Sequence, residues 1–219
     1  MSSRPTRLEY FSGEPMHVKR GYHHGSLKQA LVEAGIALLA EGGPSALTLT
    51  EAARRAGVTP AAPYRHFSGR DALLSEIARQ GFESFGARIE AAWNEGRPDA
   101  RAAMRAMCAA YLAFAREETG LYAAMFGQAA TLADPQAGGA ADHALEILWR
   151  AVVAWLQEAG APAQGARHVA LQIWAIAHGV AMLTISGHFD AGRTADPAAV
   201  LDGAVAGVMA AAVGKKATP

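Results

Sequence analysis

The spacing of apolar residues constrains this chain most, because nearly every long segment repeats them at intervals of three and four residues. That period places apolar side chains on one face of an α-helix, whereas a half-buried strand needs strict alternation. No segment alternates over more than a few residues. We therefore predict an all-α fold with about nine helices.

The composition favours a compact protein. Of the 219 residues, 51% are hydrophobic and 18% are charged, so the chain has a large core to bury and disorder is not expected. Cys108 is the single cysteine, which excludes an internal disulfide and fits a reducing compartment. Residues 1–25 contain no apolar run of the length a signal peptide needs, and we expect a cytoplasmic protein.

Charge divides the chain into two parts, although the formal net charge is zero. Residues 1–80 carry ten Lys or Arg and seven Asp or Glu, whereas residues 81–219 carry ten and thirteen. This division suggests two functions, and the zero net charge means that any anion binding must be local.

Capping residues and Gly or Pro breaks predict where the helices begin and end. The hydroxyl residues Ser26, Thr48, Thr59 and Ser68 are the expected N-caps of the first four helices. The segment from Asp134 to Ala140, rich in Gly, Ala and Pro, is expected to be a loop. The nine expected helices cover residues 27–42, 49–56, 60–67, 69–94, 99–118, 121–126, 141–159, 163–189 and 197–213.

The second and third helices, joined by Gly57-Val58-Thr59, have the spacing of a helix-turn-helix, in which the later helix enters the major groove of DNA. Such corners also arise from packing alone, so spacing does not separate a DNA-binding protein from a helical interaction protein. Pro63 removes the first hydrogen bond within the third helix, which we expect to begin tighter or later than usual.

Four segments of this region are more specific than the spacing. They are Thr48–Ala53, Ala56–Thr59, Tyr64–Phe67 and Arg70–Leu74. Together they resemble the TetR-type transcriptional repressors over about residues 20–75. Two further segments, Tyr22–Lys28 and Trp174–Gly179, resemble the subgroup with a Trp-His-Gly signature in its C-terminal domain.

The resemblance implies a repressor that binds a palindromic operator as a dimer and is released from it by a small apolar effector. It implies three regions: a flexible basic arm over residues 1–20, a helix-turn-helix domain over 21–70, and an effector-binding and dimerisation domain over 71–219. In this family a lysine that touches the DNA backbone usually stands where this chain has Arg70.

Side-chain chemistry identifies candidate DNA contacts in the front part. Tyr64 and His66 can donate hydrogen bonds to phosphates, and Arg65 can hold guanine through two hydrogen bonds. Lys19 and Arg20 can follow the backbone or enter the minor groove, unless they belong to a solvated tail. The predicted DNA-contacting residues are Lys19, Arg20, Thr48, Thr59, Pro60, Ala61, Tyr64, Arg65, His66 and Arg70.

Aromatic and methionine residues gather in the fourth to eighth helices. Each one alone could be ordinary core, but together they could enclose an apolar cavity, as ligand sites between helices do. His178 lies four residues after Trp174 on one helix face, where it could orient a ligand or bond a backbone carbonyl. The predicted effector-binding residues are Phe82, Phe85, Trp93, Met107, Tyr111, Tyr122, Trp149, Trp174 and His178.

The last two helices are the predicted dimer interface. Residues 168–189 contain no Asp, Glu, Lys or Arg, and a membrane span needs a similar length. Gln172, His178 and Ser186 dilute this run, so we expect no membrane and instead a helix between its own core and a partner. Two last helices from each copy would form a four-helix bundle that holds the recognition helices about 34–36 Å apart.

Enzymatic motifs are not found in the sequence. It has no His-Glu-x-x-His, phosphate-binding loop or nucleophile elbow, and Cys108 lies among apolar neighbours. We therefore predict a protein that is not an enzyme and that uses no metal and no cofactor.

Overall fold

The computed structural model describes residues 24–127, 133–189 and 196–214, which form helices and turns and contain no strand. The all-α prediction is confirmed. The α-helices are α1 (His24–Gly42), α2 (Leu49–Arg55), α3 (Arg70–Trp93), α4 (Ala100–Glu117), α5 (Thr119–Phe126), α6 (Pro135–Glu158), α7 (Ala166–Ile185) and α8 (Pro197–Gly214). Three 3-10 helices complete the described chain: η1 (Pro44–Ala46), η2 (Ala62–Arg65) and η3 (Asn94–Gly96). The nine predicted helices correspond to the eight α-helices and η2.

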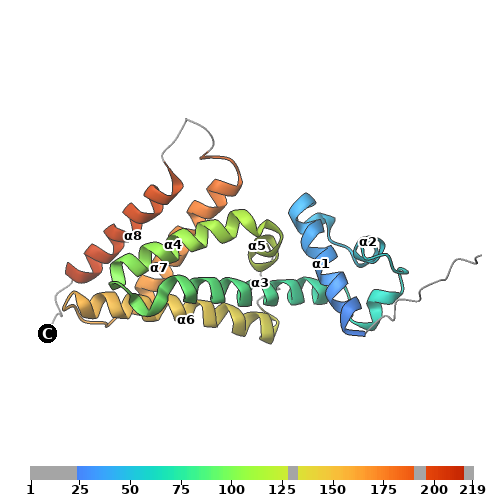
Figure 1. Ribbon diagram of the computed structural model, residues 1–219, viewed down its shortest axis with the longest axis horizontal. Coiled ribbons are helices and arrows are strands. Elements are labelled where there is room, and N and C mark those ends of the chain that lie inside the picture. The colour runs from blue at the N-terminus through green and yellow to red at the C-terminus, as the bar shows by residue number, and fades with distance from the viewer. Residues whose placement is uncertain (1–23, 128–132, 190–195, 215–219) are drawn as a thin grey trace, which may run out of the picture.

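Helix α3 joins the two parts of the molecule. Figure 1 shows α1 and α2 at one end of α3 and α4 to α8 towards the other, where α4, α5 and α6 pack directly against α3. With 24 residues, α3 is about 36 Å long. Its Ile77 packs against Gly35 of α1, whereas its Phe85 ring contacts Tyr111 and Phe114 of α4 at centroid distances of 5.1 and 5.3 Å.

The start and end of α2 follow the predicted capping pattern. Thr48 is the N-cap, and its Oγ1 accepts a hydrogen bond of 3.1 Å from the N–H of Glu51. Gly57 ends the helix in the left-handed region at φ +71°, which a glycine adopts without strain. Phe67 lies under η2 with 4% of its surface exposed and so anchors this corner to the core.

The third predicted helix is a 3-10 helix rather than an α-helix, and it begins at Ala62 instead of Pro60. Pro63 has no N–H with which to bond the Thr59 carbonyl four residues earlier. Instead, the N–H of Ala62, three residues after Thr59, donates a hydrogen bond of 3.0 Å to the Thr59 carbonyl. Such short spacing is that of a 3-10 turn, as the position of Pro63 predicts.

Three other predicted boundaries are wrong. α1 begins at His24, before Ser26, and α3 begins at Arg70 with Gly69 rather than Ser68 as its N-cap. The segment expected as a loop from Asp134 to Ala140 is the first part of α6. There the Asp134 carboxylate accepts hydrogen bonds from Gln136 and Ala137 at 2.9 and 3.1 Å, and Pro135 is the first helical residue, where its missing N–H costs nothing.

Helices α7 and α8 close the C-terminal part. α7 ends at Ile185, earlier than the expected Phe189, and packs against α4, α6 and α8. By length and composition alone both helices could cross a membrane, a test that core helices of soluble proteins also pass. Each helix buries one apolar face in the protein, through residues such as Ile173 and Leu201, which are 2% and 0% exposed.

Candidate DNA-binding surface and ligand cavity

The helix-turn-helix corner presents a polar surface to solvent. Thr59, Pro60, Ala61, Tyr64 and Arg65 are exposed, and His66 is half-buried. Tyr64 has 61% of its surface exposed, more than any other large hydrophobic residue in the described chain. Thr48, at the start of α2, is exposed as well. An aromatic residue so far out of the core is placed to contact a partner molecule.

Arg65 differs from its basic neighbours in having no acidic partner. Arg54 pairs with Glu51 and Arg55 with Glu41, each at 2.6 Å. Lys28 and Arg79 both pair with Glu76. Of the described Lys and Arg residues up to position 80, Arg65 is the one for which the structure gives no ion pair. Its charge is therefore available to an external anion or a base edge.

Arg70 is bound within the protein. Its Nε and Nη2 donate to the carbonyl oxygens of Leu47 and Pro44 at 3.0 and 2.7 Å, and Nη1 lies 3.1 Å from the Asp71 carboxylate. These contacts fasten η1 to the start of α3 and give the side chain a structural role. Lys19 and Arg20 lie outside the described residues.

A small apolar cavity lies among α3, α4, α6 and α7, and its volume is about 30 Å³. That volume holds one or two water molecules. Larger molecules would have to displace the side chains around it. The residues that line it are Phe85, Ile89, Met104, Met107, Cys108, Tyr111, Ala144, Leu145, Leu148, Ile173, Trp174 and Ala177.

The predicted effector residues fall into three groups by their position relative to this cavity. Phe85, Met107, Tyr111 and Trp174 line it. Tyr122 and His178 lie beside it and connect to Tyr111 through hydrogen bonds. The remaining three predicted residues pack elsewhere. Phe82 contacts the Phe126 ring, Trp93 contacts the turn at Gly96, and Trp149 lies 6.0 Å from the Arg167 guanidinium.

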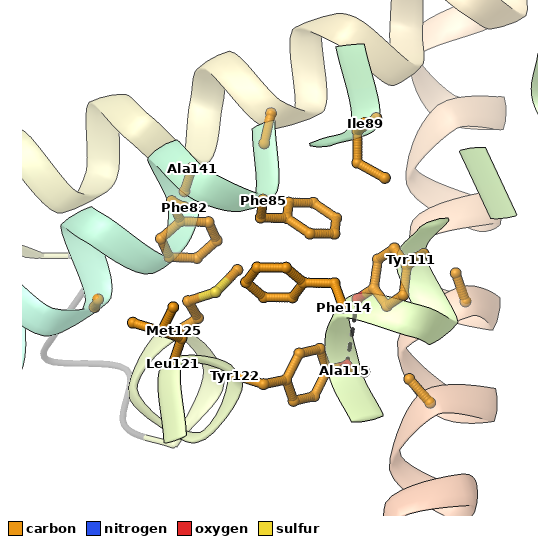
Figure 2. Close-up of a cluster of buried hydrophobic side chains, with 14 of the residues drawn as sticks. Phe82, Phe85, Ile89, Tyr111, Phe114, Ala115, Leu121, Tyr122, Met125 and Ala141 are labelled. Atoms are coloured by element: carbon orange, nitrogen blue, oxygen red, sulfur yellow. Dashed lines mark hydrogen bonds between the residues drawn. The ribbon is translucent and has the colours of Figure 1, made fainter. Parts of the chain in front are cut away.

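Tyr111, Tyr122 and His178 form a polar chain at one end of the cavity. The two hydroxyl oxygens are 3.4 Å apart, and the Tyr122 hydroxyl is 2.7 Å from Nδ1 of His178. Figure 2 shows the bond between the tyrosines among the rings of α3, α4 and α5. Burial raises the pKa of Tyr111 to about 12, raises that of Tyr122 further, and lowers that of His178. All three groups are therefore neutral near pH 7.

Sequence reasoning did not single out most of the aliphatic part of the cavity wall. Ala144, Leu145 and Leu148 come from α6, and Ile173 and Ala177 come from α7. Their helical spacing is the same as that of ordinary core residues, so no chemical signal marks them. Cys108 also belongs to this wall, together with Met104 and Met107, which are close to it in the sequence.

The outward faces of α7 and α8 are apolar. Apart from Tyr64, the exposed large hydrophobic residues of the described chain all lie on these two helices. They are Leu171, Met182, Leu183, Ile185 and Val200. Helices with apolar residues on two sides are typical of an interface between subunits.

The fold and these two sites define a helical DNA-binding regulator, with a helix-turn-helix part at one end and a ligand-binding part at the other. The family model described as "Bacterial regulatory proteins, tetR family" matches residues 31–77, and "Tetracyclin repressor-like, C-terminal domain" matches residues 104–208. The chain belongs to the TetR family. Neither model describes an enzyme.

Solved structures agree with this assignment. A protein of unknown function from Rhodococcus sp. RHA1 is 34% identical, with a TM-score of 0.75, over 89% of this chain and 100% of its own. The fatty acid degradation regulator FadR from Bacillus halodurans shares the fold at 16% identity, with a TM-score of 0.67, over 85% of this chain and 96% of its own. A TetR-family transcriptional regulator from Streptomyces coelicolor shares the fold at 18% identity, with a TM-score of 0.62, over 85% of this chain and 99% of its own. No curated protein sequence matches the chain.

Proposed function

We propose that this protein is a dimeric repressor that binds a palindromic operator and releases it when a small, largely apolar molecule enters the C-terminal part. The observation that carries the proposal is the exposed pair Tyr64 and Arg65 on the helix-turn-helix corner, one aromatic and one unpaired basic residue. The regions are those expected from the sequence: an arm over residues 1–20, a DNA-binding domain over 21–70, and an effector-binding and dimerisation domain over 71–219. The Trp174 and His178 positions also support membership of the Trp-His-Gly subgroup.

The proposed DNA contacts fall on one surface, with distinct roles. Tyr64, His66 and Thr48 contact phosphates and fix the position of the helix, whereas Arg65 reads a base. Thr59, Pro60 and Ala61 fit against base edges or methyl groups. Arg70 acts indirectly, because its hydrogen bonds to Pro44 and Leu47 hold the corner in place. Lys19 and Arg20, in the N-terminal arm, are proposed to contact the DNA backbone or the minor groove.

The proposed dimer buries the apolar outer faces of α7 and α8 against the same faces of a second copy. Leu171 and Met182, at 47% and 46% exposure, would be covered there. Burial of such residues from both copies stabilises a dimer, because covering the exposed half of each side chain contributes about 1 kcal/mol. Two recognition helices then meet two half-sites of one palindrome.

Release requires the ligand to favour a conformation whose recognition helices no longer match the operator. The cavity adjoins α3, whose other end carries the helix-turn-helix corner. Filling a cavity of about 30 Å³ with a larger molecule must move the surrounding helices. A shift of α3 would change the distance between the two corners of a dimer.

A mobility-shift experiment with the DNA that flanks the protein's own gene tests this function. Arg65→Ala should weaken specific binding about 5- to 150-fold and affect random DNA much less, as loss of a base contact does. Tyr64→Phe should weaken binding to the specific site and binding to random DNA by the same factor, because a phosphate contact does not depend on the sequence. Arg101→Ala, at an exposed position on α4, is the control and should change neither. If the protein shifts no DNA, or if Arg65→Ala behaves like the control, the proposed role is wrong.

A further inference from the structure

The wall of the cavity carries information about the charge of its ligand. None of the twelve described residues that line it is Asp, Glu, Lys, Arg or His. Next to the wall, Arg105 is already paired with Asp202 at 2.9 Å. A charged ligand would lose its hydration in this cavity without gaining an opposite charge, which is strongly unfavourable.

Polar groups in the wall are few, and one of them leads to a larger arrangement. The Tyr111 hydroxyl is hydrogen-bonded to Tyr122, which is in turn hydrogen-bonded to His178. Tyr122 and His178 also stack, with ring centroids 5.7 Å apart and planes at 22°. The contacts with Tyr111 and His178 therefore fix the position of the Tyr122 hydroxyl.

The direction of the hydrogen bonds in this chain depends on which imidazole nitrogen carries the proton. When Nδ1 of His178 is bare, Tyr122 donates to it and accepts from Tyr111, whose oxygen can then accept from the Trp174 indole and, with its other lone pair, from a ligand. When Nδ1 carries the proton, it donates to Tyr122, Tyr122 donates to Tyr111, and the Tyr111 hydroxyl donates to a ligand. The same three groups can therefore serve a ligand hydroxyl or a ligand carbonyl.

We propose that the ligand is a neutral, mostly apolar molecule with one hydrogen-bonding group, such as a hydroxyl or a carbonyl, and that the Tyr111 hydroxyl receives this group. This inference rests on the proposed function, because it takes the cavity as the effector site. The apolar body of the ligand displaces Met104 and Met107, whose unbranched side chains adapt to different shapes. Tyr122 and His178 position the Tyr111 hydroxyl without touching the ligand.

Three probes of equal chain length test the ligand class: 1-decanol, 2-decanone and decanoate at pH 7.5. Binding to the full-length protein is followed by tryptophan fluorescence, because Trp174 lines the cavity. Decanol and decanone should bind, and decanoate should bind at least tenfold more weakly. Equal or tighter binding of decanoate, or no binding of any probe up to its solubility limit, would overturn the inference.

Removal of single hydroxyl groups tests the role of Tyr111. Tyr111→Phe should weaken decanol and decanone about 3- to 10-fold, the usual value of one hydrogen bond. Ser84→Ala, which removes a hydroxyl from an exposed position on α3, is the control and should leave both affinities unchanged. Tyr122→Phe keeps the Tyr111 hydroxyl but removes the hydroxyl that is hydrogen-bonded to it, and should reduce the affinity for decanol and decanone less than Tyr111→Phe does. Unchanged affinity in Tyr111→Phe, with an unfolding temperature like that of the wild type, would refute the assignment.

The ligand class and the proposed function can fail separately. If decanol binds as expected but does not release operator DNA, ligand-released repression is wrong and the ligand class stands. If decanoate binds best and releases the DNA, the proposed function stands and the neutral ligand class is wrong.

Discussion

Glu76 of α3 offers a quantitative test of the packing between the helix-turn-helix part and α3. Its carboxylate contacts Arg79 at 2.7 Å, Gln80 at 3.0 Å and Lys28 of α1 at 3.3 Å, and its side chain is 12% exposed. Hydrogen bonds from Arg79, with a smaller effect from Gln80 and from the positive charges, lower the pKa of Glu76 from 4.5 to about 2. Such a shift means that the folded protein binds the ionised form more favourably than the unfolded chain does.

The sign of the effect follows from the lowered pKa. Above pH 4.5 Glu76 is ionised in both states and its full contribution is present, whereas it is lost as the pH falls towards about 2. The difference between 4.5 and about 2 corresponds to about 3 kcal/mol at pH 7 and about 1 kcal/mol at pH 3. We therefore expect Glu76→Gln to lower the free energy of unfolding by about 3 kcal/mol at pH 7 and by about 1 kcal/mol at pH 3.

Urea unfolding of the wild type and variant at both pH values measures this difference. Glu83→Gln is the matched control, because Glu83 contacts the same Arg79 at 2.5 Å but is 56% exposed. An ion pair of that exposure contributes about 0–1 kcal/mol, so the control should change little. If Glu76→Gln costs the same at pH 3 as at pH 7, or no more than Glu83→Gln, the argument from the pKa of Glu76 is wrong.

Two further predictions concern tight packing and the cavity wall. Gly120→Ala should destabilise the protein by about 1–3 kcal/mol, because a Cβ there would lie 2.2 Å from the Ile36 carbonyl oxygen of α1 and must push the backbones apart. Gly139→Ala, on an open face of α6, is the control and should be neutral or stabilising by up to about 1 kcal/mol. Equal unfolding temperatures for the two variants would show that the close approach of Gly120 to Ile36 does not limit stability. Burial raises the pKa of Cys108 from 9.0 to about 12, so iodoacetamide at pH 8 should modify the folded protein about a thousandfold more slowly than the urea-unfolded chain. A folded-state rate within tenfold of the unfolded rate would show that the cavity is open to solvent.

Helix positions were predictable where a local signal and the tertiary structure agree. Thr48 and Gly57 bracket α2 as predicted, because a cap and a left-handed glycine act within a few residues. The Gly and Ala residues after position 134 indicate a loop, whereas the Asp134-Pro135 pair, which resembles Thr59-Pro60, is the signal that marks the true start of α6. Each pair joins a residue that can cap a helix to a proline, yet only Asp134 caps an α-helix; after Thr59-Pro60, Pro63 prevents one, and the 3-10 helix that forms has Ala61 at its N-cap and no side-chain cap.

The candidate sites were predictable only in part, for different reasons. Exposure of Tyr64 and Arg65 agrees with their expected position on a short external helix. The Arg70 side chain could not be placed from sequence, because its partners are the carbonyls of Pro44 and Leu47, 26 and 23 residues away. Cavity residues from α6 and α7 were likewise hidden, since apolar residues of a wall and of a core look alike until helices are packed.

The contact between α5 and α1 limits how this protein can be divided or recombined. Gly120 allows α5 to approach the Ile36 carbonyl, and Ile77 of α3 occupies the space beside Gly35, so the DNA-binding end is completed by residues outside it. A fragment ending near residue 70 would expose the underside of α1 to water. Chimaeras that graft this DNA-binding head onto another regulator therefore need the contact surface of α5 and the first two turns of α3 to be transferred with it.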